Sequence, residues 1–407
     1  MNWINYRSVK SLSYERARIA GLPETYILTL SQEEASIYRD MALAIPFNPY
    51  RQDEQEDFVR SAKEIARSFA PSSRKFIEEH LQHGFGAVLV KGLPVDEELP
   101  ITPQTGGPLP PDYKTTFVSE AMLLALGELT GAEPFNFRQE GQGKAPLIDN
   151  IVPVYKLKTQ KGAGGFDNNF PFHCESAWHR KRPDYLILLG VRAAEDAQTL
   201  VFSTRMFEGT PWQTASADIR QWFRLKAPDL YVQMEKAGIP MGTADFALKP
   251  PIEHGPHGIQ LHINFNGTDC IDMKAVEWLA ELEDFIESKT VGTIISSGDA
   301  LLLNNYLTCH TRTGYSPVFN GMDRWFLRGY FKKDLWARNE KAAGEVYDEQ
   351  TFREMIALGW MSDDGTLTTS FSKFVHQPEE VKKLEDREAA LATLAFQLTP
   401  IAGTRLV

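Results

Sequence analysis

The chain is poor in cysteine, in long apolar runs and in positive charge. Its 407 residues include three cysteines, Cys174, Cys270 and Cys309, with no CxxC spacing. Neither a disulfide framework nor a structural zinc site is therefore indicated, and a reducing compartment fits. The amino terminus lacks the charged start and apolar stretch of a signal peptide, and the uninterrupted apolar runs are too short to span a bilayer. We expect a cytoplasmic protein with no membrane partner.

Acidic residues outnumber basic ones, which gives a formal net charge of -11 at pH 7 and a pI of about 5.4. Binding of nucleic acid requires clustered Lys and Arg side chains. The one dense basic group is the short run from His179 to Arg182, which we expect to be a solvated loop. The sequence therefore argues against a nucleic-acid partner. With 43% hydrophobic and 24% charged residues, the composition is that of an ordinary folded protein, and a globular enzyme is the default interpretation.

The hydrophobic period changes along the chain. Residues 1–80 show helical patterns, including a capping-box signal at Ser31 and Glu34. Residues 81–335 contain short apolar runs bounded by Gly, Pro, Asn or Asp, which is typical of a sandwich or jelly roll. Residues 336–407 return to a helical pattern. Within the middle region we expect strands near residues 86–90, 151–157, 185–191, 200–203, 230–233, 259–265, 294–296, 300–304 and 325–331, and a helix over 273–288.

The most informative segment is His173-Cys174-Glu175. Neighbours in a strand point to opposite faces, so His173 and Glu175 would share a face while Cys174 points away. His310 would add a second imidazole from another strand. Two imidazoles and one carboxylate on one side of a metal, with the other side open, form the facial triad of non-haem Fe(II) oxygenases. His-x-Glu alone is a weak signal, but the apolar residues around it favour a bound cation, because a buried carboxylate without a partner is costly.

Arg324 follows the turn signal Asn320-Gly321. This signal predicts a hairpin that would return Arg324 to a place beside His310. The planar guanidinium group suits a carboxylate held by two hydrogen bonds, so Arg324 is predicted to anchor a co-substrate. The alternative is a structural ion pair of Arg324 with Asp299 or Asp323.

Together these segments resemble the clavaminate synthase-like branch of the taurine dioxygenase superfamily. These are Fe(II)- and 2-oxoglutarate-dependent oxygenases that include amino-acid β-hydroxylases. The resemblance rests on residues 172–175, 298–305, His310 and 320–328, and it covers roughly residues 80 to 335. It implies one α+β domain, mainly β with helical extensions at both ends, around a double-stranded β-helix (jelly-roll) core. It also implies Fe(II) as the cofactor, with 2-oxoglutarate and dioxygen as co-substrates.

The resemblance also implies roles for particular residues. Arg324 matches the arginine that binds the distal carboxylate of 2-oxoglutarate, and Thr199 falls where the family has a threonine that assists the same co-substrate. Arg328 matches a basic position near the carboxylate of the substrate or co-substrate, and alternation along a strand puts it on the same face as Arg324. The iron ligands are matched by His173, Glu175 and His310.

In the arginine hydroxylases of this branch, acidic residues hold the guanidinium group of the substrate. Asn264 and Asn266 stand where such acids are expected, which argues against a cationic substrate side chain, although Asp269 and Asp272 remain alternatives. Further candidates for contact with the substrate are Gln139, Gln142, Asp167, Asn168 and Arg328.

We therefore expect hydroxylation of an unactivated C–H bond in a free amino acid or amino-acid derivative, with release of succinate and CO2. The partner would be a small molecule of metabolism. The same cofactor chemistry would also allow desaturation, cyclisation or epoxidation, whereas Glu175 argues against a halogenase, in which this carboxylate is missing. A different alternative is a non-catalytic jelly roll with zinc in the triad. A rival metal cluster, formed by His254, His257 and His262, lacks a strand-borne carboxylate at a matching spacing.

Overall fold

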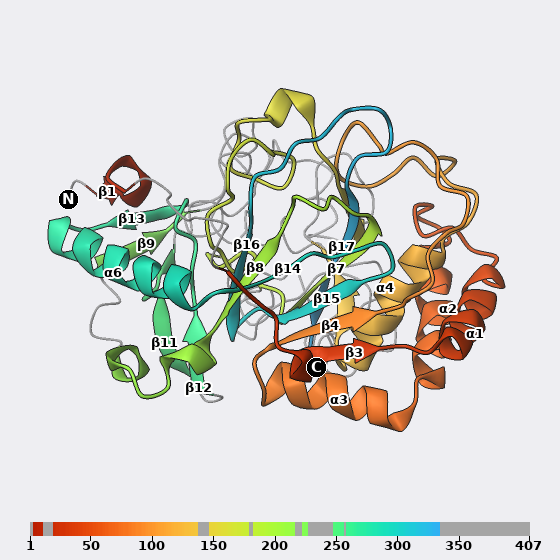
Figure 1. Cartoon of the computed structure of the whole chain (residues 1–407), viewed down its shortest axis with the longest axis horizontal. Coiled ribbons are helices and arrows are strands. Elements are labelled where there is room, and N and C mark those ends of the chain that lie inside the picture. Colours follow the sequence, from red (N-terminus) through yellow and green to blue (C-terminus); the bar gives the residue numbers. More distant parts are fainter. Residues whose placement is uncertain are drawn as a thin grey trace, which may run out of the picture.

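The computed structural model describes residues 3–10, 19–136, 146–178, 182–215, 222–226, 247–255 and 258–333 (Figure 1). The strand expected near 230–233 and the helical extension expected over 336–407 lie outside the described residues. Within these ranges, every helix is too short or too polar to cross a membrane.

The largest element is a seven-stranded sheet in the order β3-β4-β15-β7-β17-β5, with β6 also paired to β17. Strand β3 runs parallel to β4, and the other neighbours are antiparallel. The strands are β3 (Ile27–Thr29), β4 (Ala87–Lys91), β5 (Glu133–Phe135), β6 (Ile148–Ile151), β7 (Tyr185–Arg192), β15 (Ala300–Asn304) and β17 (Trp325–Lys332).

A four-stranded sheet faces the large one, in the order β16-β8-β14-β2. Its strands are β2 (Ala20–Gly21), β8 (Thr199–Ser203), β14 (Val291–Thr293) and β16 (Thr308–Arg312). Because successive side chains of a strand point to opposite faces, alternate residues of both sheets meet in one buried cluster, which includes Leu188, Phe326 and Val201. The two sheets lie together in the centre of the molecule (Figure 1).

Four helices cover the outer face of the large sheet: α1 (Gln32–Leu43), α2 (Gln55–Ser68), α3 (Pro71–Gln82) and α4 (Val118–Leu129). Helix α4 packs on β7 and β17, and α1 and α2 pack on α4 (Figure 1). Helix α4 is apolar almost all round because both of its sides are buried. It ends before Gly131, which has a φ of 69°, the left-handed conformation that glycine adopts without strain. The capping box of Ser31 and Glu34 is confirmed at the start of α1.

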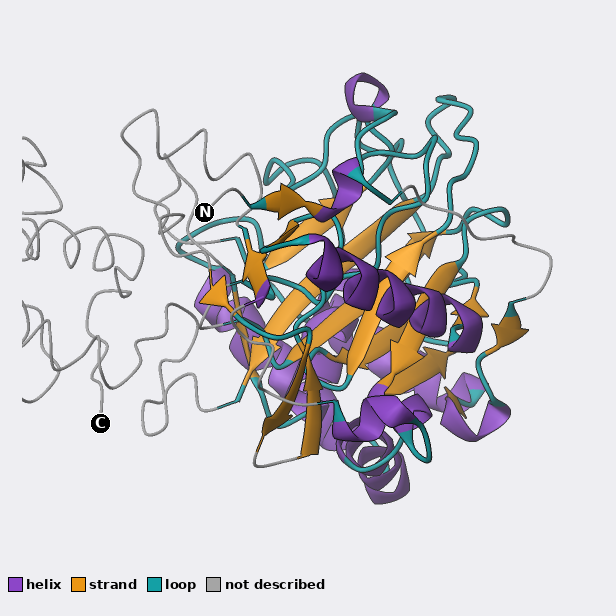
Figure 2. Cartoon of the chain, turned by 90° about the vertical axis from the view of Figure 1, so that its left-hand side faces the viewer, coloured by secondary structure: helices purple, strands orange, loops and turns teal. Residues whose placement is uncertain are grey.

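Helix α6 (Met273–Lys289) covers the outer face of the small sheet (Figure 2). Its apolar residues, such as Leu282, share a buried cluster with Leu200 and Phe202, which alternate along β8 with the residues that face the large sheet. The remaining elements are a sheet of β1 (Ile4–Asn5), β13 (Thr268–Cys270), β9 (Phe223–Leu225) and β10 (Ala247–Leu248), the hairpin β11 (Ile252–Gly255) and β12 (Gly258–Leu261), and the 3-10 helices η1 (Tyr6–Ser8), η3 (Glu24–Tyr26), η4 (Tyr155–Leu157), η5 (Thr204–Phe207) and η6 (Pro211–Thr214).

An α+β architecture that is mainly β is confirmed, but some expected elements differ. The strand expected over 151–157 is the last residue of β6 followed by a 3-10 helix, and the strand expected over 294–296 lies at 291–293 instead. The amino-terminal part is not only helical, because β1, β2 and β3 each form the edge of a different sheet. Arg182, expected in a solvated loop, is 1% exposed. It stacks 3.9 Å above the ring of Tyr306, which offsets the loss of hydration.

Gly127 is the point of closest approach between α4 and β17. A Cβ atom at this position would lie 1.8 Å from a ring carbon of Phe331. In an isolated helix, replacement of Gly by Ala stabilises by about 1 kcal/mol. Here the added methyl group would push α4 off the sheet, so we expect Gly127→Ala to lower the free energy of unfolding by about 1–3 kcal/mol in urea denaturation.

Gly162→Ala is the matched control, since a Cβ at Gly162 would meet nothing within 4 Å. We expect this variant to change the free energy of unfolding by less than about 0.5 kcal/mol. Equal stability of the two variants would show that the contact between α4 and β17 is looser than described.

Candidate active site

His173 and His310 are brought together by backbone pairing. His310 lies in the middle of β16, and His173 forms an isolated antiparallel bridge with it. The two residues exchange hydrogen bonds, from His173 N to His310 O at 3.0 Å and from His310 N to His173 O at 2.9 Å. The pairing therefore fixes both imidazoles on the face that looks toward the large sheet.

Glu175 lies at the start of a turn and not in a regular strand as expected. The next residue, Ser176, has a φ of 50°, so the chain turns away at once. Asn305 holds this turn: its Oδ1 accepts from Glu175 N at 2.7 Å and its Nδ2 donates to Glu175 O at 3.0 Å. The predicted alternation still holds, because Cys174 points away from the cavity into the apolar cluster behind the small sheet.

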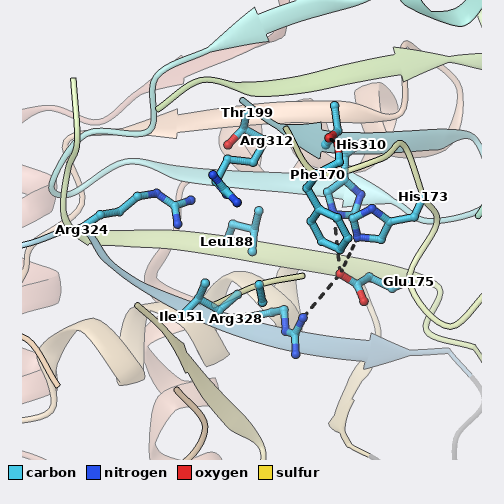
Figure 3. A pocket seen from close by; sticks show the side chains of 12 residues that line it. Ile151, Phe170, His173, Glu175, Leu188, Thr199, His310, Arg312, Arg324 and Arg328 are labelled. Carbon is cyan, nitrogen blue, oxygen red and sulfur yellow. Dashed lines mark hydrogen bonds and ion pairs between the residues drawn. The ribbon is translucent and has the colours of Figure 1, made fainter. Parts of the chain in front are cut away.

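The ligand atoms of His173, Glu175 and His310 lie within 4.8 Å of one another. Oε1 of Glu175 is 3.6 Å from Nε2 of each histidine (Figure 3). Nδ1 of His173 lies 3.0 Å from the carbonyl oxygen of Pro171. A carbonyl only accepts, so Nδ1 must donate, and the lone pair of Nε2 is left facing the other two ligand atoms. The three groups thus present donor atoms from one side, as a metal site requires.

The protonation states also suit a metal. Burial, and to a smaller extent the nearby His173, lower the pKa of His310 to about 4. Burial alone would raise the pKa of Glu175, but Arg328 and the two imidazoles hold it well below its usual range. His310 is therefore neutral and Glu175 is ionised at neutral pH, which are the states that bind a cation.

A cavity between the two sheets opens beside these three residues, with about 440 Å³ not filled by protein atoms, part of it open to solvent. Thr199, Arg324 and Arg328 line it, as does Arg312, which sequence reasoning missed (Figure 3). Thr199 on β8 pairs directly with Arg312 on β16. The cavity thus combines a metal-binding corner with a strongly basic wall.

Arg324 reaches the cavity by a route that the sequence did not predict. The turn near Gly321 is present, with a φ of 86° at that residue. The expected hairpin is nevertheless wrong, because β16 belongs to the small sheet and β17 to the large one. Residues 313–324 form no strand and cross from one sheet to the other. An Asn-Gly turn sets a local reversal of the chain, but it does not set which sheet the following strand joins.

The guanidinium group of Arg324 is buried, at 5% exposure, and stacks 3.6 Å above the ring of Phe326. Among the described residues, its Nε and Nη1 have no hydrogen-bond partner. Asp299 and Asp323 instead accept backbone N–H groups, so neither supplies the ion pair considered as an alternative. Burial lowers the pKa of Arg324 to about 10. A buried cation with two free N–H groups on a cavity fits a bound carboxylate.

Arg328 on β17 lines the same cavity as Arg324, which precedes that strand, but it is already paired. Its Nη2 is 2.9 Å from Oδ2 of Asp149, its cross-strand neighbour on β6, and its Nη1 is 3.6 Å from Oε1 of Glu175. Burial lowers the pKa of Arg328, but Tyr330, Glu175 and Asp149 raise it above its usual value.

Two residues that were missed could have been found from the period of two along a strand. Arg312 lies two residues after His310, and Tyr330 lies two residues after Arg328; both face the space between the sheets. Asp149 gave no such signal, because it is a single acid in a short strand far away in sequence.

The other predicted substrate residues do not line the described cavity. Asn264 accepts from the backbone N–H of Gly267, Asn168 donates to the carbonyl of Thr159, and Asn266 is exposed. Asp167 also stands outside the lining, and Gln139 and Gln142 lie outside the described residues. Asp269 and Asp272, kept as alternatives, serve structure: the first pairs with Arg224 and Lys226, and the second caps α6.

The rival histidines do not converge in the part of the chain that is described. His262 is buried, with Nε2 at 2.9 Å from Glu253, and burial lowers its pKa to about 4. His254 is exposed on the neighbouring strand. His257 lies outside the described residues.

No family profile matches the chain. It is 25% identical over 325 residues to L-asparagine oxygenase of Streptomyces coelicolor, covering 78% of this chain and 93% of the relative. It is 29% identical over 320 residues to clavaminate synthase 2 of Streptomyces clavuligerus, covering 75% and 93%. The crystal structure of the non-haem iron oxygenase OrfP with Fe, succinate and (3S)-hydroxy-L-Arg matches with a TM-score of 0.66, at 20% identity over 79% of this chain and 99% of that one.

These relatives support the resemblance to the clavaminate synthase-like branch of the taurine dioxygenase superfamily that the sequence shows. The chain is an enzyme of the Fe(II)- and 2-oxoglutarate-dependent class. The donor set of two imidazoles and a carboxylate fits Fe(II). The two free N–H groups of Arg324 fit a carboxylate of 2-oxoglutarate.

The low pKa of His310 predicts acid sensitivity of the metal-free protein. Folded His310 stays neutral down to a pKa of about 4, whereas an unfolded histidine takes up a proton near pH 6.5. Between these two pH values only the unfolded state binds a proton at this histidine. The free energy of unfolding therefore decreases as the pH falls through this range. The free energy of unfolding of the wild type should therefore fall by about 2 kcal/mol, on account of His310, between about pH 7 and about pH 5. We expect His310→Gln to lack this contribution, as measured by urea denaturation in EDTA.

His254→Gln is the control, because that histidine is exposed and outside the cavity. It should keep the pH dependence of the wild type. Identical pH dependence in all three proteins would contradict the protonation state assigned to His310.

Arg324→Met should abolish binding of 2-oxoglutarate while leaving metal binding intact. The metal-free variant should unfold at a temperature no lower than the wild type, because the change removes a buried cation without a partner. In the presence of Mn(II), 2-oxoglutarate at a hundred times its dissociation constant should stabilise the wild type by about 2.7 kcal/mol and the variant not at all, as measured by thermal unfolding.

Arg182→Met is the matched control for this variant. Arg182 is also buried, and its Nε and Nη2 also lack hydrogen-bond partners, but it does not line the cavity. This control should keep the response to 2-oxoglutarate. An undiminished response of Arg324→Met would remove Arg324 from the co-substrate site.

Proposed function

We propose that this enzyme hydroxylates an unactivated C–H bond of a free amino acid or amino-acid derivative. One dioxygen and one 2-oxoglutarate would be consumed, and the products would be the alcohol, succinate and CO2. The observation that carries the proposal is Arg324, whose unpaired N–H groups face the same cavity as the His-Glu-His set. The relatives support the substrate class, since their names describe oxygenation of asparagine and hydroxylation of enduracididine, ornithine, arginine and lysine.

His173, Glu175 and His310 would hold the iron. When bound, Fe(II) supplies the redox chemistry that couples oxidation of 2-oxoglutarate to activation of dioxygen. Arg324 would fix the distal carboxylate of 2-oxoglutarate through its two free N–H groups. Thr199, on the neighbouring strand, would support the same co-substrate through its hydroxyl group.

The protein's further contribution is a shaped space with an apolar side next to the triad. Ile151, Phe170 and Leu188 line the cavity beside the triad, and the ring of Phe170 lies 4.2 Å from that of His173. These apolar groups exclude water and would hold the target carbon of the substrate close to the metal corner.

The charge of the cavity bears on the substrate. Arg312, Arg324 and Arg328 line it, and Glu175 is the one acid among the described lining residues. Arg328 would meet the carboxylate of the amino acid, and its Nε has no partner in the described part of the chain. A cationic side chain would find no free acid on this wall, so we infer that the side chain of the substrate is neutral or acidic.

We further propose that the two facing sheets form a double-stranded β-helix, or jelly roll. Residues 81–335 would be its catalytic core, and residues 1–80 and 336–407 would be extensions packed on it as one domain. The packed inner faces of the two sheets support this assignment.

The test is anaerobic addition of Fe(II) and 2-oxoglutarate, followed by air and a panel of amino acids. We expect the visible charge-transfer band of the chelate, then succinate release with a neutral or acidic amino acid and a product heavier by one oxygen atom. His173→Ala should show neither the band nor succinate. A product lighter than the substrate by two hydrogen atoms would show that the reaction is desaturation or cyclisation and not hydroxylation. Tight binding of zinc without any charge-transfer band would favour the non-catalytic alternative.

A further inference from the structure

The two carboxylate oxygens of Glu175 have different surroundings. Oε1 faces the metal corner, 3.6 Å from Nε2 of His173 and of His310. Oε2 accepts a hydrogen bond from the hydroxyl group of Tyr330 at 2.7 Å, in a fully buried contact. A carboxylate can bind a metal through one oxygen or through both, so the partner of the second oxygen matters.

Tyr330 is held by strand pairing on both sides within the large sheet. Its backbone pairs with Leu186 of β7 on one side and with Phe135 of β5 on the other. The side chain is 6% exposed, and Cζ of Arg328 lies 4.8 Å from the centre of its ring. The phenol stays protonated at neutral pH. The fold thus presents a fixed hydrogen-bond donor to one oxygen of Glu175.

The backbone of Glu175 is fixed independently, by the side chain of Asn305. Loss of the Tyr330 hydroxyl would therefore leave the backbone of Glu175 in place. It would free Oε2 of the carboxylate, while the contact of Oε1 with Arg328 at 3.6 Å would remain.

We propose that Tyr330 is a positioning residue that keeps Glu175 a one-oxygen ligand of the metal. Its hydrogen bond holds Oε2 away from the metal corner. This inference rests on the proposed function, because 2-oxoglutarate and dioxygen together need every position that a facial triad leaves open. A carboxylate that bound through both oxygens would take one of those positions.

The experiment compares Tyr330→Phe, which keeps the ring and removes the hydroxyl, with Tyr6→Phe. Tyr6 donates to Glu283 at the same distance of 2.7 Å, also in a buried contact, but behind the small sheet and outside the cavity. Both variants lose one buried hydrogen bond from tyrosine to glutamate. Their losses of thermal stability should therefore be similar.

Only Tyr330→Phe should change the metal site. We expect the affinity of its Co(II)-loaded form for 2-oxoglutarate, measured by anaerobic titration, to fall by about 10-fold or more, because a second oxygen of Glu175 on the metal would take a position that 2-oxoglutarate needs. We also expect the visible spectrum of bound Co(II) to differ from that of the wild type. Replacement of Tyr330 by 4-aminophenylalanine, which keeps the ring and places an N–H donor where the hydroxyl was, should restore much of the 2-oxoglutarate affinity.

Co(II) and 2-oxoglutarate binding of Tyr330→Phe equal to that of Tyr6→Phe would overturn the inference and leave Tyr330 a purely structural residue. If Tyr330→Phe does not fold, the 4-aminophenylalanine variant decides: 2-oxoglutarate affinity and a Co(II) spectrum near those of the wild type support the inference, and their loss opposes it. Failure of the proposed function is separate. A wild type that binds metal and 2-oxoglutarate but hydroxylates no amino acid would contradict that function while the measured role of Tyr330 stands.

Discussion

The constraint on which the structure depends is the burial of charge between two sheets that otherwise meet through apolar side chains. Leaving an ionised group there without a partner is costly. Arg328 is balanced by Asp149 and Glu175, and Glu175 is held in turn by Tyr330. Among the described residues, Arg324 has no such balance. This imbalance is the reason for proposing that a carboxylate of 2-oxoglutarate binds at Arg324.

The position of the metal corner follows from one backbone pairing. The bridge between His173 and His310 sets two imidazoles side by side, with ring centres 4.4 Å apart. The turn that starts at Glu175 then places the carboxylate 3.6 Å from Nε2 of both imidazoles. Most of the remaining cavity wall comes from strands of the two sheets, so the site is built on rigid elements, with loops at its mouth.

The sequence predicted the elements better than their arrangement. The alternating pattern around His173 and His310 predicted the shared face, because a period of two is a local property. The path of Arg324 could not be predicted, since the choice between two sheets depends on packing far away in the chain. Asp149 was missed for the same reason: it meets Arg328 across 179 residues of sequence. The substrate contacts predicted for Asn264 and Asn266 depended on analogy with relatives, and in the structure Asn264 binds a backbone N–H group while Asn266 is exposed.

The amino-terminal edge strands have a consequence for how the chain is made. β1 pairs with β13 and β2 pairs with β14, strands that lie beyond residue 260, whereas β3 finds β4 nearby. During synthesis the first two therefore leave the ribosome long before their partners exist. Contacts of such long sequence separation form slowly. The first two strands thus pair with strands that are translated late, and we expect these two sheet edges to close late in the maturation of the protein.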